Sequence, residues 1–283
     1  MTTHEEWTAQ QDSTTVGLDS HEVEVAYYEG GDPADHTVVF LHGIPTWSFL
    51  WRNVVGVLEA DYHVLAPDMA GYGNSAMWDG FDRSVRAQED MLDNLLDDLG
   101  VERPVSLVAH DIGGGAALRM AAHDPEAVER LVVSNAVCYD SWPVEFVSNL
   151  GLPDTTGMDF EELEAQLDFA FGDGLYGDAA DHQDFVEGMK APWLTETGRR
   201  SLSRDATATN TNHTTELDYT AITAAVTCLW GVDDVMQPVA YGERLAEDVA
   251  GDSEVVRLED TFHWVVEDQP EAYREGLADA FGV

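Results

Sequence analysis

The stretch LVAHDIGGGAAL, residues 107–118, contains an aspartate, Asp111, where a strand pattern gives way to a helix pattern. The apolar run 105–109 predicts a buried strand, and 113–122 predicts a helix packed closely behind it. A sharp turn between them forces the backbone together, so only small residues fit at 109 and 113, and these are Ala109 and Gly113. Such a corner is typical of an exposed nucleophilic side chain. This stretch alone equally allows Asp111 to be a helix N-cap.

Length and composition limit what this corner can mean. The chain has 283 residues, of which 44% are hydrophobic, enough for one core or one core with a lid. No apolar stretch approaches the roughly 20 residues that span a bilayer, and the N-terminal MTTHEEWTAQQDSTT is unlike a signal peptide. We therefore expect a cytoplasmic protein without a membrane partner. Cys138 and Cys228 lie outside any metal-ligand spacing, which predicts two reduced core thiols and no metal site.

The charge of the chain is strongly one-signed. It has 13 Lys and Arg residues against 55 Asp and Glu residues, a formal net charge of −42. Nucleic acid is therefore a poor partner. Such a charge destabilises a compact state unless salt screens it, and at about 1 M salt the Debye length is roughly 3 Å. The acidic residues alternate with apolar ones at helical spacing, as in 89–98, which is typical of solvated helix faces. We expect a protein of a salt-adapted, halophilic organism.

Strand and helix patterns alternate along most of the chain. The first 30 residues predict a hairpin, and single strands and helices follow it in turn. The predicted strands are 14–18, 23–28, 37–41, 63–66, 105–109, 130–134, 227–230 and 254–258, and the predicted core helices are 50–58, 84–99, 113–122, 239–250 and 267–281. This order predicts an α/β fold with a mostly parallel sheet, joined by right-handed crossovers and covered by helices on both faces.

The alternation breaks in the second half of the chain. Residues 137–219 carry two helical stretches, 160–171 and 180–190, and no convincing strand. The sequence therefore predicts a helical cap, or lid, over this range. The lid is inserted into one α/β core, which is made of residues 1–136 and 220–283.

Three residues with useful chemistry directly follow predicted strands. They are Asp111, Asp234 and His263. In a sheet of this kind, ligands bind beyond the carboxyl ends of the strands. The chain order nucleophile, acid, histidine is that of a Ser…Asp…His triad on such a sheet, with aspartate in place of serine. Asp234 alone could be a turn residue and His263 a loop histidine, but their shared position and order favour a catalytic site.

The motifs beside these strands resemble a known family over nearly the whole chain. The segments that carry the resemblance are HGIPTWSFLWR, DMAGYGNS, AHDIGG, WGVDDVMQP and FHWVVEDQP. Together they resemble the α/β-hydrolase branch that contains haloalkane dehalogenases and epoxide hydrolases, which use an aspartate nucleophile. The HGIPTWSFLWR segment looks most like that of the dehalogenases. The resemblance implies an α/β-hydrolase fold with an inserted helical cap.

The resemblance also implies a role for each matching residue. Asp111 is the nucleophile, His263 the base and Asp234 its acid partner. The backbone N–H groups of Ile44 and Ile112 form the oxyanion hole.

The acid partner has alternatives in the sequence. Some dehalogenases place it after the strand that precedes the lid, where this chain has Asn135, so Asp234 keeps the role. Asp233 is the alternative, because the spacing to Pro238 favours Asp234 by only one residue.

An aspartate nucleophile determines the kind of reaction. A carboxylate is already ionised near neutral pH and can displace a leaving group from saturated carbon, which produces an alkyl ester of Asp111. Hydrolysis of that ester requires a water activated by neutral His263, which Asp234 orients. Two backbone N–H donors would stabilise the charge that develops on an Asp111 oxygen. We expect a small apolar organic substrate, an alkyl halide or an epoxide, with water as co-substrate and no cofactor.

The residues that would hold a departing halide are not in their usual places. Dehalogenases of this branch use a tryptophan after the nucleophile and a second donor, but those positions are Ile112 and Ile44, whose side chains cannot donate. Trp47, Trp142 and Trp193 are the candidate substitutes. The dehalogenase remains the preferred prediction because of the HGIPTWSFLWR segment.

An epoxide hydrolase is the alternative, and it needs lid tyrosines that protonate the opening ring. The candidates are Tyr139, Tyr176 and Tyr219, none in a pattern specific to that chemistry. A non-enzymatic ligand-binding member of the fold is a further alternative. The presence of all three predicted catalytic residues argues against it. A serine-type esterase is disfavoured because no serine occupies the corner at Asp111. The sequence predicts nothing about the oligomeric state.

Overall fold

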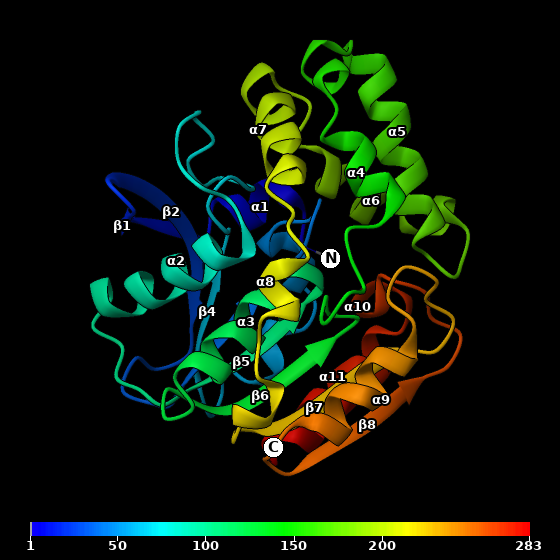
Figure 1. The fold of residues 1–283 in the computed structure, drawn as a ribbon. Coiled ribbons are helices and arrows are strands. Elements are labelled where there is room, and N and C mark those ends of the chain that lie inside the picture. The colour runs from blue at the N-terminus through cyan, green and yellow to red at the C-terminus, as the bar shows by residue number, and fades with distance from the viewer. Residues whose placement is uncertain (1) are drawn as a thin grey trace.

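The computed structural model describes residues 2–283 and shows an eight-stranded sheet (Figure 1). The strands are β1 (Gln11–Leu18), β2 (His21–Gly30), β3 (Thr37–Leu41), β4 (His63–Pro67), β5 (Val105–His110), β6 (Val128–Ser134), β7 (Ala225–Gly231) and β8 (Ser253–Leu258). Their order in the sheet is β1-β2-β4-β3-β5-β6-β7-β8. The β1–β2 hairpin and the β2–β4 pair are antiparallel, and all later neighbours pair in parallel. The predicted mostly parallel α/β fold is confirmed.

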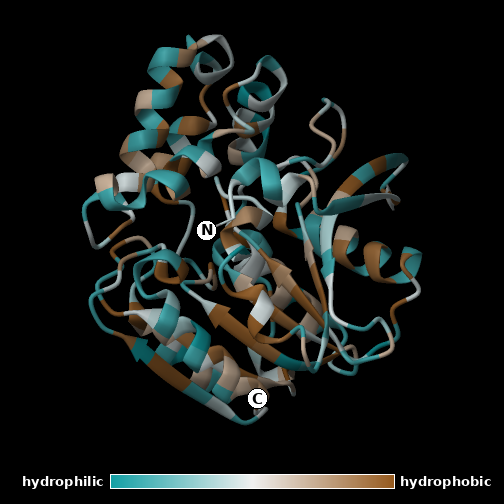
Figure 2. Ribbon diagram, turned by 180° about the vertical axis from the view of Figure 1, so that it is seen from behind, coloured by the Kyte–Doolittle hydropathy of each residue, from teal (hydrophilic) through white to brown (hydrophobic). Residues whose placement is uncertain are grey.

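Helices cover both faces of the sheet. The core helices are α2 (Val85–Asp98), α3 (Asp111–His123), α9 (Val239–Asp248), α10 (Val265–Asp268) and α11 (Pro270–Phe281). Successive side chains of a strand point to opposite faces, and on β5 Leu107 belongs to one buried cluster and Val108 to the other. Leu118 of α3 and Leu245 of α9 join the cluster of Leu107, whereas Leu277 of α11 joins that of Val108. Figure 2 shows the apolar residues concentrated in the central strands.

The predicted helix 50–58 is wrong. The chain forms two short 3₁₀ turns there, η1 (Ser48–Trp51) and η2 (Val55–Val57). The large apolar side chains of this segment are almost all buried, so packing in all directions sets its path. Gly56 and its β-branched neighbours also have low helix propensity.

The predicted helix 267–281 is two helices in the structure. A short α10 precedes α11, and Gln269 between them has non-helical backbone angles. Pro270 has no backbone N–H group and suits the first position of a new helix, which explains the break.

Between β6 and β7 the described chain forms helices and turns and no strand. These elements are α4 (Glu145–Leu150), η3 (Pro153–Gly157), α5 (Phe160–Asp173), η4 (Ala179–His182), α6 (Gln183–Lys190), α7 (Glu196–Thr207), α8 (Asn212–Thr215) and η5 (Tyr219–Ala221). Figure 1 shows α4 to α7 beyond the carboxyl ends of the parallel strands. The predicted lid, 137–219, lies within this segment, and we keep it as a proposed lid. None of the helices in residues 2–283 is both long and apolar enough to cross a membrane.

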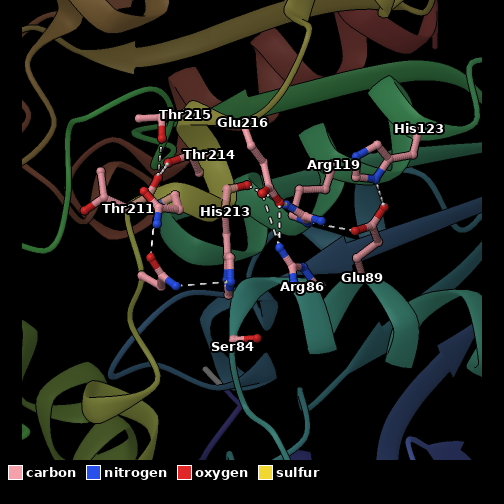
Figure 3. Close-up of polar contacts among 12 residues, drawn as sticks. Ser84, Arg86, Glu89, Arg119, His123, Thr211, His213, Thr214, Thr215 and Glu216 are labelled. Carbon is pink, nitrogen blue, oxygen red and sulfur yellow. Dashed lines mark hydrogen bonds and ion pairs between the residues drawn. The ribbon is translucent and has the colours of Figure 1, made fainter.

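Arg119 joins α3 to the chain that returns from the proposed lid (Figure 3). Its side chain is 3% exposed. Its Nε atom lies 2.7 Å from Glu89 Oε2 on α2, and its Nη1 atom donates to the His213 carbonyl and to Glu216 Oε1, both at 2.7 Å. Arg86 also contacts Glu216, but its side chain is half exposed. The helix that begins at Asp111 is therefore tied to the end of the lid by one buried cation.

Arg119→Met should lower the free energy of unfolding by about 3 kcal/mol, because it leaves the Glu89 carboxylate without its buried partner. Arg86→Met is the matched control, and its cost should stay below about 1 kcal/mol, since exposed ion pairs contribute little. Urea unfolding at molar salt measures both. Equal losses in the two variants would contradict this account of the cluster.

The net charge of −42 predicts a strong dependence of stability on salt. Raising the salt from about 0.1 M to about 3 M should increase the melting temperature by about 10 °C or more, because it screens repulsion between surface carboxylates. Circular dichroism measures the change. Sucrose, which adds no ions, is the control, and a flat melting temperature across the salt series would contradict the proposed salt adaptation.

Candidate active site

A sharp corner between β5 and α3 presents Asp111. Asp111 is the first residue of α3 and has φ of 49°, in the left-handed region that non-glycine residues rarely adopt. His110, and not Asp111, is the N-cap residue, so the helix-cap interpretation does not hold. A Cβ atom on Gly113 would lie 2.3 Å from the His42 carbonyl oxygen, which explains why no side chain is tolerated there.

Four segments bring polar groups to the Asp111 carboxylate. The Ile44 backbone N–H, after β3, donates to Asp111 Oδ1 at 2.8 Å. The N–H group of Ile112 also bonds to this carboxylate. His263 Nε2, after β8, lies 3.8 Å from Asp111 Oδ2, and His263 Nδ1 lies 2.8 Å from Asp234 Oδ2, after β7. The structure thus brings together all five residues that were predicted to have a catalytic or oxyanion-hole role.

Asp234 and its alternative, Asp233, have different surroundings. Asp234 is buried against His263, whereas Asp233 is exposed and lacks a contact with that histidine. Asn135 follows β6 and fixes Asp234 further: its Nδ2 donates to Asp234 Oδ2 and its Oδ1 accepts from the Gly231 N–H at 3.0 Å. From the sequence, Asn135 stands only where some dehalogenases have the acid, and its contact with Asp234 could have been inferred from its place after β6.

The three titratable groups shift one another's pKa values. Burial raises the pKa of Asp111, opposed by the charge of His263 and by the two backbone N–H groups. Burial lowers the pKa of His263, but the charges of Asp234 and Asp111 outweigh it and raise that pKa above its ordinary value. Burial also raises the pKa of Asp234, yet its interactions with His263 lower it overall. Asp234 is therefore the ionised partner that stabilises an imidazolium.

His110 is a second buried histidine beside the site. Its ring centre lies 4.7 Å from that of His263, and its Nδ1 atom lies 3.0 Å from the Ser134 carbonyl oxygen. Burial, and then the proximity of His263, hold the pKa of His110 well below its ordinary value. A neutral His110 adds no charge that would oppose protonation of His263.

Comparison with known families identifies the fold family. Residues 36–213, more than half of the chain, match the alpha/beta hydrolase fold family. The chain belongs to this family. The sheet order, the corner at Asp111 and the positions of Asp234 and His263 are the features of this α/β-hydrolase fold that the site uses.

Individual relatives have several activities. The chain is 41% identical to cis-3-alkyl-4-alkyloxetan-2-one decarboxylase of Shewanella oneidensis over 100 residues, 35% of this chain and 31% of that protein. It is 38% identical to epoxide hydrolase A of Mycobacterium tuberculosis over 98 residues, 34% of this chain and 30% of that protein. The matches thus span about a third of these relatives. A solved haloalkane dehalogenase from Bradyrhizobium elkani superposes with a TM-score of 0.78 at 24% identity, covering 96% of this chain and 98% of that one, and so shows the shared fold alone.

A small cavity of about 30 Å³ lies between the site and the proposed lid. It is lined by Asp111, His263 and Gln237 and by the apolar residues Ile44, Pro45, Val144, Phe146, Val147, Ala170, Met236 and Trp264. This volume holds about two waters. Within residues 2–283 no group of three or more His, Cys, Asp or Glu side chains is arranged to hold a metal ion.

The predicted halide donors do not face this cavity, which corrects the sequence analysis. Trp47 Nε1 donates to the Gly188 carbonyl at 2.9 Å, Trp193 Nε1 to the Pro45 carbonyl at 2.7 Å, and Trp142 Nε1 to Thr214 Oγ1 at 2.8 Å. A buried indole N–H needs such a partner, and each of these already has one. A halide would therefore find no free indole donor among the three.

The predicted tyrosines also lie away from the cavity. Tyr139 donates to Asp248 Oδ2 at 2.8 Å, and Tyr219 donates to the Thr214 carbonyl at 3.0 Å. Tyr176 is half exposed and packs edge-on against Phe262. None of these three lines the cavity, so none can donate a proton to a substrate held there in this arrangement.

Proposed function

We propose that this α/β-hydrolase attacks saturated carbon with the Asp111 carboxylate and forms a covalent alkyl ester. The observation that carries the proposal is the position of the carboxylate. It lies on the corner after β5, with Oδ1 bonded to the Ile44 N–H and Oδ2 facing His263 Nε2. No serine is available at this corner, and a carboxylate needs no base before it attacks.

His263 would act in the second half of the reaction. Its Nε2 atom would take a proton from a water, and the hydroxide formed would attack the carbonyl carbon of the ester. Negative charge then develops on an Asp111 oxygen, where the N–H groups of Ile44 and Ile112 can stabilise it. Collapse expels the alkoxide, which takes the proton from His263 and leaves as the alcohol. The carboxylic acid formed at Asp111 then loses its proton to solvent, which restores the carboxylate. Asp234 would stabilise the imidazolium between these steps. A non-enzymatic binding protein would need none of this arrangement.

The site best suits a leaving group that departs as a weakly basic anion. We therefore propose a haloalkane dehalogenase-like hydrolysis of a carbon–halogen bond. An opening epoxide produces an alkoxide, which must be protonated, and no tyrosine lines the described cavity. A halide leaves without a proton. The apolar lining suits a small alkyl group.

A second candidate substrate is an oxetan-2-one, a four-membered lactone. The relative from Shewanella oneidensis, 41% identical over 100 residues, is a decarboxylase of such rings. Asp111 would attack the ring carbon that bears the ring oxygen, and the carbon–oxygen bond would break to leave a carboxylate, again a weak base. Loss of CO₂ would then form a carbon–carbon double bond and expel the Asp111 carboxylate. No water is consumed in that sequence.

A substrate panel separates these reactions. The protein, in molar sodium sulfate to avoid added halide, is incubated with 1-chloro-, 1-bromo- and 1-iodoalkanes, cis-3,4-dialkyloxetan-2-ones, terminal epoxides and p-nitrophenyl esters. Halide, CO₂, diol and phenolate are measured separately. Halide release supports the first candidate and CO₂ the second. Diol formation would contradict the preference over an epoxide hydrolase, and phenolate alone would contradict attack on saturated carbon.

Hydrolysis of the ester should depend on pH through His263. Its rate should fall about tenfold per pH unit below the pKa of His263, because a protonated imidazole cannot take a proton from water. Esterified Asp111 has lost its charge, so in the intermediate it no longer raises that pKa as it does in the free protein. Rapid-quench mass spectrometry follows decay of the ester after a pH jump. A decay rate unchanged between about pH 5 and pH 8 would remove His263 as the base.

A further inference from the structure

Gln237 is buried beside the proposed nucleophile with an unpaired side-chain amide. It is 2% exposed and lines the same cavity as Asp111 and His263. Its Oε1 atom is buried and has no hydrogen-bond partner within residues 2–283. A buried amide oxygen without a partner is unusual, because it has lost its bonds to water and gained none. This amide therefore has free hydrogen-bonding capacity for a ligand.

The backbone of Gln237 is fixed from both sides. The N–H group of the preceding residue, Met236, donates to Asp234 Oδ1 at 2.7 Å, and the Gln237 carbonyl oxygen accepts from Trp230 Nε1 at 2.7 Å. Pro238, which follows, precedes the first turn of α9. The loop that supplies the acid partner of His263 thus also holds the Gln237 amide at the cavity.

The other polar side chains of the cavity are already engaged. Trp264 Nε1 donates to the Phe171 carbonyl at 3.0 Å. His263 Nδ1 is bonded to Asp234, and its Nε2 faces Asp111. Asp111 is an acceptor when ionised. Among the cavity-lining side chains within residues 2–283, the Gln237 amide is therefore the one with a fully buried polar atom that has no protein partner.

We propose that the Gln237 N–H₂ group hydrogen-bonds the leaving group of the substrate. The assignment rests on the proposed function. As an Asp111 oxygen forms its bond to carbon, the electron pair of the breaking bond departs with the leaving group, and the resulting anion accepts the Gln237 hydrogen bond. No proton is transferred. Rotation about the last side-chain bond exchanges the amide nitrogen and oxygen, so the N–H₂ group can face the cavity.

This residue also limits the substrate class. A primary amide is too weak an acid to protonate an alkoxide, but its N–H bonds strengthen when the acceptor is an anion. Gln237 therefore suits a halide or a carboxylate leaving group and does not suit the alkoxide of an epoxide. Gln237 would therefore be the leaving-group donor, the role predicted from the sequence for Trp47, Trp142 and Trp193.

The test measures the alkylation step alone. It uses His263→Gln, in which the ester is expected to accumulate, and compares it with His263→Gln/Gln237→Met and His263→Gln/Gln237→Leu. Adduct formation on 1-chloro-, 1-bromo- and 1-iodoalkanes is timed by intact-protein mass spectrometry in sodium sulfate. Met236→Leu in the same background is the matched control, because Met236 lines the same cavity and has no N–H group to lose. Circular dichroism checks that each variant is folded.

Both Gln237 variants should alkylate about 10- to 100-fold more slowly with the chloroalkane. The loss should be smaller with the iodoalkane, since iodide accepts hydrogen bonds more weakly, whereas Met236→Leu should affect all three halides alike. Unchanged rates, or equal slowing for all halides, would overturn the role of Gln237 and leave the proposed function intact. Failure of His263→Gln alone both to form an adduct with any haloalkane and to release CO₂ from an oxetan-2-one would overturn both. Because the two replacements differ in shape, a folding defect in one leaves the other to decide the outcome.

Discussion

Asp111→Asn is expected to abolish turnover, by about 10⁴-fold or more, on every substrate that the unaltered protein converts. An amide oxygen is a far weaker nucleophile than a carboxylate, and the first covalent step depends on that nucleophile. The fold should be retained. Asparagine has nearly the same shape, tolerates the left-handed backbone that residue 111 adopts, and can still accept from the Ile44 N–H group.

The measurement uses freshly purified protein whose mass confirms the amide, since hydrolysis of the side chain would restore the aspartate. Initial rates are compared for the unaltered protein, Asp111→Asn and Asp233→Asn. Asp233 is the matched control because it is exposed, lies beside Asp234 in the chain and does not contact His263. Its variant should keep its activity within about twofold, as expected for a surface change. Activity retained by Asp111→Asn would refute the proposed nucleophile.

The sequence predicted the parts of the molecule that depend on short-range pattern. Strands such as 105–109 are continuous apolar runs because both faces of a parallel sheet are covered, and this kind of run is easily recognised. The chemistry follows from the same fact. Since parallel strands end at one edge of the sheet, residues after β5, β7 and β8 must meet there, and Asp111, Asp234 and His263 lie within contact distance.

The parts that the sequence could not predict depend on which partner a buried polar group finds. Trp47 and Trp193 are plausible donors to a ligand by residue type, but each pairs with a backbone carbonyl more than 100 positions away in the chain. Asn135 and Gln237 are the reverse case. Nothing in their residue type distinguishes them from ordinary loop residues. Only their burial and hydrogen bonds show that Asn135 holds Asp234, whereas the buried amide oxygen of Gln237 has no partner. Such assignments require the three-dimensional packing.

The wrong prediction of a helix over residues 50–58 has a related cause. Apolar periodicity predicts a helix where one face is buried and the other is solvated. Here Phe49, Leu50, Trp51 and Val54 are all buried, so the pattern carries no information about a face. Packing around these side chains, and not hydrogen bonding along a helix, determines the path of the segment that follows Ile44.

His263→Gln is expected to stop the reaction halfway and to leave a stoichiometric adduct on Asp111. The first step needs no base, because the Asp111 carboxylate is already charged, whereas water cannot attack the ester efficiently without one. Glutamine cannot take the proton from water, although it can fill part of the space of the imidazole beside Asp234. Steady-state turnover should therefore fall by about 10⁴-fold or more while the first turnover persists. His123→Gln, a change of an exposed histidine on the same helix α3, is the control and should turn over normally.

The mass of the adduct also identifies the bond that was broken. A haloalkane adds its alkyl group without the halogen, whereas an oxetan-2-one adds its whole mass, because the leaving carboxylate stays attached to the carbon chain. In the second case the adduct should decay even without His263, since loss of CO₂ requires no activated water. Peptide mapping should place either adduct between residues 105 and 119. Unaltered protein turning over a haloalkane in ¹⁸O-water should incorporate label into the Asp111 carboxylate, because water attacks its carbonyl carbon. Turnover of a haloalkane without an adduct in His263→Gln and without label at Asp111 would exclude the covalent route for that substrate and leave Asp111, at most, as a base that activates water.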